Sequence, residues 1–341
     1  MPQSTVVTGK CRSLVIHFDS AGSLGGRDPS DFRDPTFFEI ADVFFELATK
    51  YKCVYSIFVI GRDLLNPEVA ARVRDWSQRG HEIANHSFHH LVNLGSLPER
   101  VIEDEISRSH ELIYRSTGVA PEGFVAPNWS VSRKVLEVLL RLGYRYDTSC
   151  FPSLWMSLVN GVLWCTEQDG RQRGAILQRH DMPRSAFWPF RPFILQDKQA
   201  APAADRELVE MPLPVIGGLR IPIWHTAAFF YPPGVFRYLL RRISQWNYFY
   251  YIMHPADVFD RQDLRDVPLA AARFARMNVS QRKKKLLLEQ SLDIIAADSS
   301  LMCLRDMGRR IRLEQASALH HRYSLDDLFP AAKAAADGPG E

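Results

Sequence analysis

The chain has 341 residues, of which 46% are hydrophobic and 24% charged, a composition typical of folded globular proteins that excludes wholesale disorder and fibrous repeats. Its formal net charge of +3 is too small to indicate a nucleic-acid-binding protein. The five cysteines are scattered and form no C-x-x-C pair, which argues against a disulfide framework or a thiolate zinc site.

Short apolar runs alternate with segments of helical period along the first half of the chain. The predicted elements are strands at 14–18, 54–59, 83–84, 123–126 and 144–148, and helices at 35–50, 67–79, 98–116 and from a cap at Ser130 to about Leu142. Such repeated strand-helix units favour a parallel sheet or barrel.

The helical and strand periods are lost between residues 151 and 206, where aromatic residues, prolines and arginines are mixed. The pattern then resumes with predicted strands at 208–213, 248–253 and 302–305 and helices at 233–245 and 280–297. We therefore expect one α/β domain at 12–313 with an elaborated aromatic loop region at 151–206. Residues 314–341 form a small, polar C-terminal tail in this interpretation.

The first residues carry no basic start followed by an apolar run, and charged residues or prolines interrupt every apolar stretch. These features predict a cytoplasmic protein without a membrane-spanning helix.

Two histidines follow directly after the predicted strand at 83–84. His86 and His90 can present imidazole nitrogens to one divalent metal, for which zinc is the leading candidate. The carboxyl ends of strands in parallel α/β folds are the places where sites assemble. The alternative interpretation is that the pair packs or caps a turn.

Three further polar positions follow predicted strands. Asp19 comes after the apolar run 14–18 and is a candidate metal ligand or general base, or else an Asp that starts a turn. Asn128 follows Pro127, and its backbone N–H could stabilise an oxyanion beside a sugar-stacking Trp129. His254 is a candidate proton donor to a leaving amine, with a buried structural histidine as the rival interpretation.

In this order, the segments His17-Phe18-Asp19, His86-Ser87-Phe88-His89-His90, Ala126-Pro127-Asn128-Trp129, Tyr146-Asp147-Thr148-Ser149 and His254-Pro255 resemble the motifs of the NodB-type polysaccharide deacetylases. The resemblance covers most of residues 12–313. It implies a distorted (β/α)7-type barrel and a hydrolase that acts on a linear amide C–N bond, removing an N-acetyl or N-formyl group from an amino sugar.

The resemblance also implies roles for individual residues. His86 and His90 match the family's metal-binding histidines, and Asp19 matches its catalytic base by position. Asp147 matches the fourth motif, where it would hydrogen-bond His254 and raise its pKa toward neutrality.

Two positions depart from the family pattern, because Ser20 replaces a second aspartate and Val125 replaces an arginine. Asp19 therefore remains a candidate for either the base or the metal ligand. The loop residues Asp28, Asp31 and Asp34 are alternative sources of a carboxylate ligand.

The tryptophan after Asn128 and the missing arginine resemble the branch typified by the deformylase of lipid-linked aminoarabinose. This implies an amino-sugar substrate carried on undecaprenyl phosphate or a nucleotide, and peripheral contact with the inner face of the membrane. A catalytically impaired glycan-binding or lipid-sugar-binding barrel is the alternative function, and a membrane-surface scaffold is a third.

Overall fold

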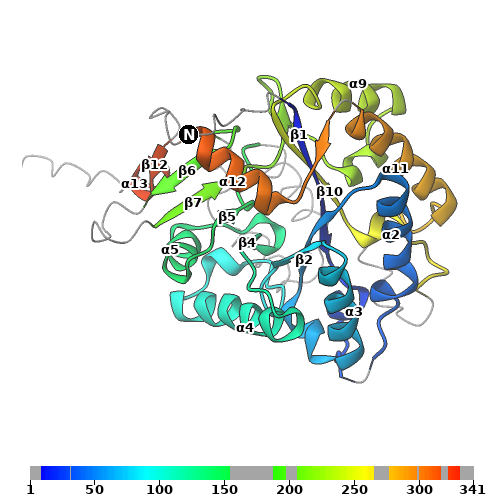
Figure 1. The fold of residues 1–341 in the computed structure, drawn as a ribbon, viewed down its shortest axis with the longest axis horizontal. Coiled ribbons are helices and arrows are strands. Elements are labelled where there is room, and N and C mark those ends of the chain that lie inside the picture. Colours follow the sequence, from blue (N-terminus) through cyan, green and yellow to red (C-terminus); the bar gives the residue numbers. More distant parts are fainter. Residues whose placement is uncertain are drawn as a thin grey trace, which may run out of the picture.

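The computed structural model describes residues 9–30, 32–153, 187–196, 206–264, 276–297, 299–315 and 322–330. In these residues the chain forms a mostly parallel sheet surrounded by helices (Figure 1). This confirms the predicted α/β class.

A single sheet forms the frame of the molecule. Its strands are β1 Cys11–Phe18, β2 Tyr55–Val59, β3 Glu82–Asn85, β4 Gly123–Phe124, β5 Tyr146–Asp147, β6 Phe193–Gln196, β7 Glu207–Glu210, β10 Tyr248–Met253, β11 Ser300–Leu301 and β12 Arg322–Ser324. In the spatial order β10-β1-β2-β3-β4-β5-β7, every neighbouring pair is parallel, whereas β6 joins β7 antiparallel. The short strands β8 Val215–Ile216 and β9 Ile221–Pro222 form a separate hairpin.

Helices cover the outside of this curved sheet (Figure 1). They are α1 Ala21–Leu24, α2 Glu39–Tyr51, α3 Pro67–Gln78, α4 Glu99–Thr117, α5 Arg133–Leu142, α9 Pro233–Ile243, α11 Gln281–Ala296, α12 Leu304–Gln315 and α13 Leu325–Leu328. The cap of α5 is Ser132, whose hydroxyl accepts from the Val135 N–H, and not Ser130 as predicted. Ser130 instead accepts a hydrogen bond from the Gly95 N–H.

Side chains alternate between two cores along each strand, as the two-residue strand period requires. On β1, Val15 packs in an inner core with Phe58 of β2 and Ile252 of β10, whereas Leu14 and its outward-facing neighbours pack against the helices. The sheet therefore encloses its own core, which is the arrangement of a barrel.

Helix α12 closes the amino-terminal end of the barrel. Its residues Leu304, Met307 and Ile311 belong to the inner core. The strand predicted at 302–305 is wrong, because pairing with β1 ends at Leu301 and a helix begins at Leu304. The short apolar run at 302–305 resembles a strand. The helical spacing becomes visible only when Leu304, Met307 and Ile311 are considered together.

Backbone pairing does not close the barrel between β7 and β10 in the described residues. A side chain spans this seam instead, since the Tyr250 hydroxyl donates to the Met211 carbonyl at 3.0 Å. The barrel is therefore distorted, with one seam joined by a tyrosine.

The predicted loop region and the predicted tail each contain regular secondary structure. Within the loop region at 151–206, residues 193–196 form β6, and residues 154–186 and 197–205 lie outside the described part. Residues 322–330, expected in the tail, add β12 to β6 and place Leu325, Leu328 and Phe329 in a core with α5. No helix in the described residues is both long and apolar enough to cross a bilayer.

The seam makes a testable contribution to stability. We expect Tyr250→Phe to lower the free energy of unfolding by about 1–2 kcal/mol, because the buried Met211 carbonyl loses its donor across the seam. Urea unfolding measures the change, and Tyr238→Phe on an exposed ring is the matched control. Equal stability of both variants would show that the seam bond contributes nothing.

Candidate functional site

Asp19, His86 and His90 meet at the carboxyl-terminal end of the barrel. Each offers one ligand atom, and these atoms lie within 4.8 Å of one another. Asp19 Oδ1 is 3.3 Å from His86 Nε2 and 3.4 Å from His90 Nε2. Two imidazole nitrogens and one carboxylate oxygen form a common ligand set for a divalent transition metal.

Backbone geometry brings the two histidines together. Residues Ser87 and His90 have φ of 62° and 58°, so the chain turns sharply after β3. Asn85 stabilises the turn by accepting from the Ser87 N–H at 2.8 Å. The buried Glu105 of α4 accepts from the backbone N–H of His89 and lies 2.5 Å from its Nδ1. Helix α4 therefore anchors the histidine loop.

A hydrogen bond fixes the ring of His86 in the form that a metal needs. Its Nδ1 lies 2.8 Å from the carbonyl oxygen of Val125, and because a carbonyl only accepts, this nitrogen carries the proton. The lone pair of Nε2 then faces Asp19. Burial lowers the pKa of His86 despite the nearby Asp19, which keeps the ring neutral.

Asp19 fits a metal ligand better than an ordinary buried carboxylate. Its Oδ1 is buried and has no hydrogen-bond partner among the described residues. Burial alone would raise the pKa of Asp19, but His90 and His86 outweigh this and hold it well below the usual value. An ionised oxygen without a donor, flanked by two imidazoles, is a ready ligand for a cation.

The alternative carboxylates are placed elsewhere. Asp34 is buried and accepts from the backbone N–H groups of Gly22 and Thr36, and Asp28 is exposed and binds Ser30. Asp31 lies outside the described residues. Among the residues described, Asp19 alone brings a carboxylate to the two histidines.

Ser20, at the position of the family's second aspartate, faces away from this cluster. It is fully buried and caps α1 by accepting from the Ser23 N–H at 3.2 Å. Its hydroxyl also interacts with the buried Asp63, whose pKa is raised to about 7 by burial and by the charge of Asp34. Ser20 thus serves the fold of the loop behind the site.

His254 lies on the same rim, next to β1. Its ring centroid is 5.4 Å from that of His17, which is in turn 5.4 Å from that of His86. Asp257 Oδ2 lies 3.7 Å from His254 Nδ1 and accepts from the His254 backbone N–H. Burial would lower the pKa of His254, but Asp257 and Asp19 outweigh it and raise this pKa.

The carboxylate beside His254 is therefore Asp257, and the predicted contact with Asp147 is wrong. Tyr146 packs in the inner core, so the next residue of β5 points to the opposite face of the sheet. There the buried Asp147 accepts from Ser149 and interacts with Glu210, and burial raises its pKa to about 6.

The sequence contained a signal for Asp257 that the prediction missed. Asp257 stands three residues after His254 and completes a capping box around the turn η6 Pro255–Asp257. The buried Lys284 of α11 supports this turn by donating to the carbonyls of Ala256 and Phe259. Lys284 thus has a structural role in this turn.

Asn128 and Trp129 occupy the end of β4 in the turn η4 Pro127–Trp129. Both have left-handed φ, 53° and 52°, which is costly for residues other than glycine and is a feature of functional sites. The ring of Trp129 lies 5.7 Å from His17 and packs with Phe151 and Trp224. These rings form an aromatic wall beside the histidines.

Val125, at the position of the family's arginine, has a different role here. Its side chain fills the inner core, and its carbonyl orients His86. No guanidinium enters the cluster from this position.

Comparisons with known proteins agree with this geometry. Residues 9–146 match the polysaccharide deacetylase family. The chain is 32% identical over 131 residues to the peptidoglycan deacetylase of Helicobacter pylori, and the matched segment covers 38% of this chain and 44% of that protein. It is also 32% identical over 102 residues to the peptidoglycan-N-acetylmuramic acid deacetylase PdaA of Bacillus subtilis, covering 29% of this chain and 37% of that protein. The chain thus spans less than half the length of either relative.

The fold also resembles solved structures. A protein from Mycobacterium smegmatis, described as a candidate polysaccharide deacetylase, superposes with a TM-score of 0.57 at 15% identity and covers 92% of this chain and 94% of that one. This likeness confirms the fold, and the matched family supports the predicted NodB-type relationship.

The orientation of Ser20 leads to a prediction. We expect Ser20→Asp to leave metal affinity unchanged and to destabilise the fold by roughly 2 kcal/mol or more, because a new carboxylate would be buried beside Asp63. The loss should grow as the pH rises from about 4 to 7. Buried carboxyls with raised pKa bind protons more tightly in the folded state, so stability falls as these protons leave.

Thermal unfolding at pH 5 and pH 8 measures this effect, with Ser20→Ala as the control for the lost cap. Tighter metal binding by Ser20→Asp would instead place this side chain in the cluster.

Proposed function

We propose that this chain is a metal-dependent hydrolase that removes an N-acyl group from an amino sugar. The observation that carries the proposal is the convergence of Asp19, His86 and His90 on the rim that also holds His254. The match of residues 9–146 to the polysaccharide deacetylases and the two deacetylase relatives support it.

The ligand set suits zinc, which, when bound by Asp19, His86 and His90, would activate water and polarise the acyl carbonyl. Asp19 contributes the negative charge, and His86 enters as a neutral ring with its Nδ1 proton held by Val125. We therefore propose Asp19 as a metal ligand rather than as the base.

His254 supplies the proton that the leaving amine requires when the amide C–N bond breaks. Asp257 orients the ring and raises its pKa, which keeps more of the histidine protonated near neutrality. His17, whose pKa is lowered by burial and by the nearby His254, stays neutral and adds no competing charge. Asp147, on the other face of the sheet, takes no part in this transfer.

The aromatic wall fits a sugar ring. Trp129 and its neighbours Phe151 and Trp224 offer apolar faces for stacking, and the Asn128 backbone N–H is the proposed donor to the acyl oxygen. The acyl group is proposed to be acetyl or formyl. On the basis of the motif resemblance, we further propose that the amino sugar is carried on undecaprenyl phosphate or a nucleotide. The protein would then contact the inner face of the membrane.

Metal analysis tests the site before any substrate is known. We expect His86→Ala and Asp19→Asn each to weaken zinc binding by roughly tenfold or more, since each removes one of three ligands. Asp28→Asn, an exposed carboxylate outside the cluster, is the matched control. Unchanged zinc content in Asp19→Asn would return Asp19 to the role of base.

The same purified proteins should be assayed for acetate or formate release from N-acetylated and N-formylated amino sugars. Stoichiometric zinc without any release would favour the alternative of a glycan-binding barrel that has lost catalysis.

The pH profile tests the role of His254. We expect kcat/KM to fall as the pH rises through the raised pKa of His254, because the proton donor is lost. Asp257→Asn should move this alkaline limb to lower pH, since the carboxylate that raises the pKa is gone. Thr226→Val removes a neutral hydroxyl that contacts both the His254 ring and Asp257 but leaves the carboxylate in place, so it is the control and should move the limb less. An unmoved limb in Asp257→Asn would exclude His254 as the titrating acid.

A further inference from the structure

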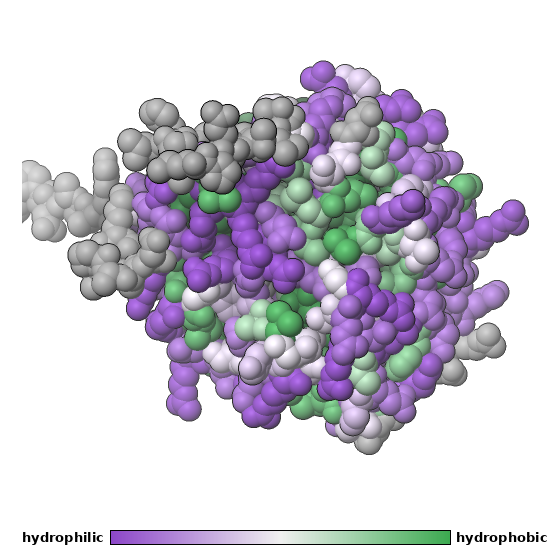
Figure 2. Space-filling view, viewed as in Figure 1, coloured by the Kyte–Doolittle hydropathy of each residue, from purple (hydrophilic) through white to green (hydrophobic). Residues whose placement is uncertain are grey.

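Helix α9 lies at the edge of the molecule, beside α11 (Figure 1). One side of the helix packs Phe236, Leu240 and Ile243 into the core. The opposite side is open to solvent, and hydrophilic residues project from this edge of the molecule (Figure 2). The exposed side chains of the helix after Gly234 are Val235, Arg237, Tyr238, Arg241 and Arg242. The chemistry of the proposed hydrolase gives them no role.

Tyr238 stands at the centre of this face, with 61% of its surface exposed. Val235 precedes it by three residues, and Arg241 and Arg242 follow it by three and four residues. Residues at these spacings are neighbours on a helix surface. An aromatic ring and a valine are therefore exposed to solvent beside two guanidinium groups.

A second exposed ring lies just before the helix. Phe230 follows the turn η5 His225–Phe229 and is 62% exposed. The guanidinium of the exposed Arg276 lies 4.8 Å from the centre of its ring. The combination of an exposed ring with arginine is thus repeated here. We call the following residues the α9 surface: Phe230, Val235, Arg237, Tyr238, Arg241, Arg242 and Arg276.

The α9 surface is positively charged because no acid of its own segment offsets the arginines. Residues 211–256 contain no aspartate or glutamate, although the chain has 39 acidic residues in all. Within the described part of the chain, Arg237, Arg241 and Arg242 form no ion pair and no side-chain hydrogen bond.

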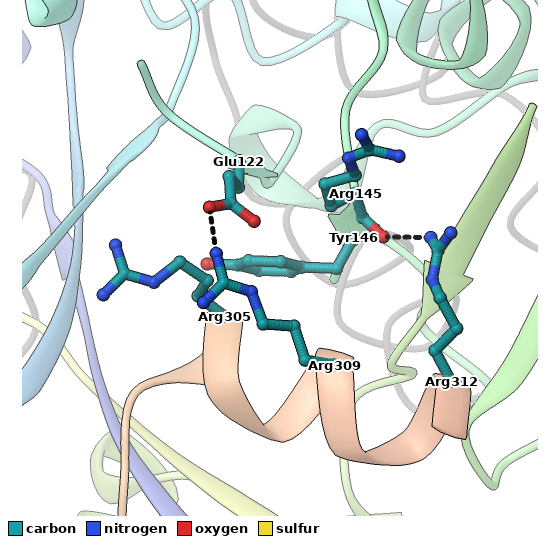
Figure 3. Close-up of a pocket in the computed structure, with 7 residues that line it drawn as sticks. Glu122, Arg145, Tyr146, Arg305, Arg309 and Arg312 are labelled. Atoms are coloured by element: carbon teal, nitrogen blue, oxygen red, sulfur yellow. Dashed lines mark hydrogen bonds and ion pairs between the residues drawn. The ribbon is translucent and has the colours of Figure 1, made fainter. Parts of the chain in front are cut away.

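The arginines of α12 are in a different situation. Arg309 pairs with Glu122 at 2.6 Å (Figure 3), and Arg312 lies 3.8 Å from a carboxylate oxygen of Glu207. Those charges are balanced within the molecule, whereas the charges of α9 are available to a partner.

The α9 surface begins close to the rim that holds His254. The turn η5 contacts both β10 and α9. The hydroxyl of Thr226 in this turn donates to Asp257 at 2.9 Å, and Asp257 is the carboxylate beside His254. A partner bound at the start of α9 would therefore lie next to the candidate site.

We propose that the α9 surface docks on an anionic lipid bilayer. Arginines that reach lipid phosphates, together with aromatic and aliphatic side chains that enter the headgroup region, are the pattern of a helix lying in the membrane interface. The buried side of α9 stays in the protein core, so the helix would lie flat on the membrane. This inference rests on the membrane contact in the proposed function and names the surface that makes it.

Co-sedimentation of the full chain with lipid vesicles tests the proposal. We expect binding to vesicles that contain phosphatidylglycerol, little binding to pure phosphatidylcholine, and a difference that shrinks as salt is raised. The double variant Arg241→Gln, Arg242→Gln should bind roughly tenfold or more weakly, since each arginine near an anionic surface contributes about fivefold. Tyr238→Ser should weaken binding at low and at high salt, because it removes apolar contact.

The matched control is the double variant Arg79→Gln, Arg115→Gln. It removes the same charge from two exposed arginines that are paired with Asp75 and Glu111 on other helices, so it should bind like wild type. Absence of binding to phosphatidylglycerol vesicles, or equal losses in both double variants, would overturn the proposal.

The fate of the proposed function is read separately from the same proteins. Zinc content and acyl release from a water-soluble amino sugar should be equal in wild type and in the α9 variants. Vesicle binding without hydrolysis would contradict the hydrolase and support the α9 surface, whereas hydrolysis without vesicle binding would contradict the α9 surface alone.

Discussion

The electrostatic situation of one carboxylate organises the candidate site. Asp19 remains ionised in a mostly buried position, and two imidazole nitrogens more than 3 Å away are its nearest partners. Burying a charge without strong hydrogen bonds is unfavourable unless a cation completes the surroundings. The turns after β3, the Glu105 anchor and the bond from His86 to Val125 all act to maintain this arrangement. These contacts hold the candidate ligand atoms of Asp19, His86 and His90 close to one another.

The sequence was sufficient to predict the parallel architecture and the residues at the strand ends. Apolar runs such as the one before Asp19 have a clear length and boundary, and parallel strands direct their carboxyl ends to a common rim. His86, His90 and His254 were found in this way, and they do share that rim with Asp19. Position along a strand also predicts which face a side chain occupies, and this rule would have excluded Asp147 as the partner of His254.

Other features depend on contacts that no single segment reveals. The direction of Ser20 is decided by the cap of α1 and by Asp63, which is 43 residues further along the chain. Helix α12 stands where a strand was predicted, because its apolar residues fill the amino-terminal end of the barrel. This packing depends on distant strands, so the local sequence does not reveal it. Likewise, β12 is recruited by β6, so a segment of tail-like composition becomes part of the sheet. In each case tertiary packing overrides the local pattern.

In the described residues, the seam between β7 and β10 lacks the backbone pairing that joins the other neighbouring strands of the barrel wall. Strands β10, β1, β2, β3 and β4 are hydrogen-bonded to one another in this spatial order, so His254 and the candidate ligands Asp19, His86 and His90 follow strands of one continuous arc. Across the seam, the Tyr250 hydroxyl bond to the Met211 carbonyl and apolar packing in the inner core join β10 to the β7 side in the described residues. Breathing at this joint would widen the mouth of the barrel and leave the spacing of the reactive groups untouched.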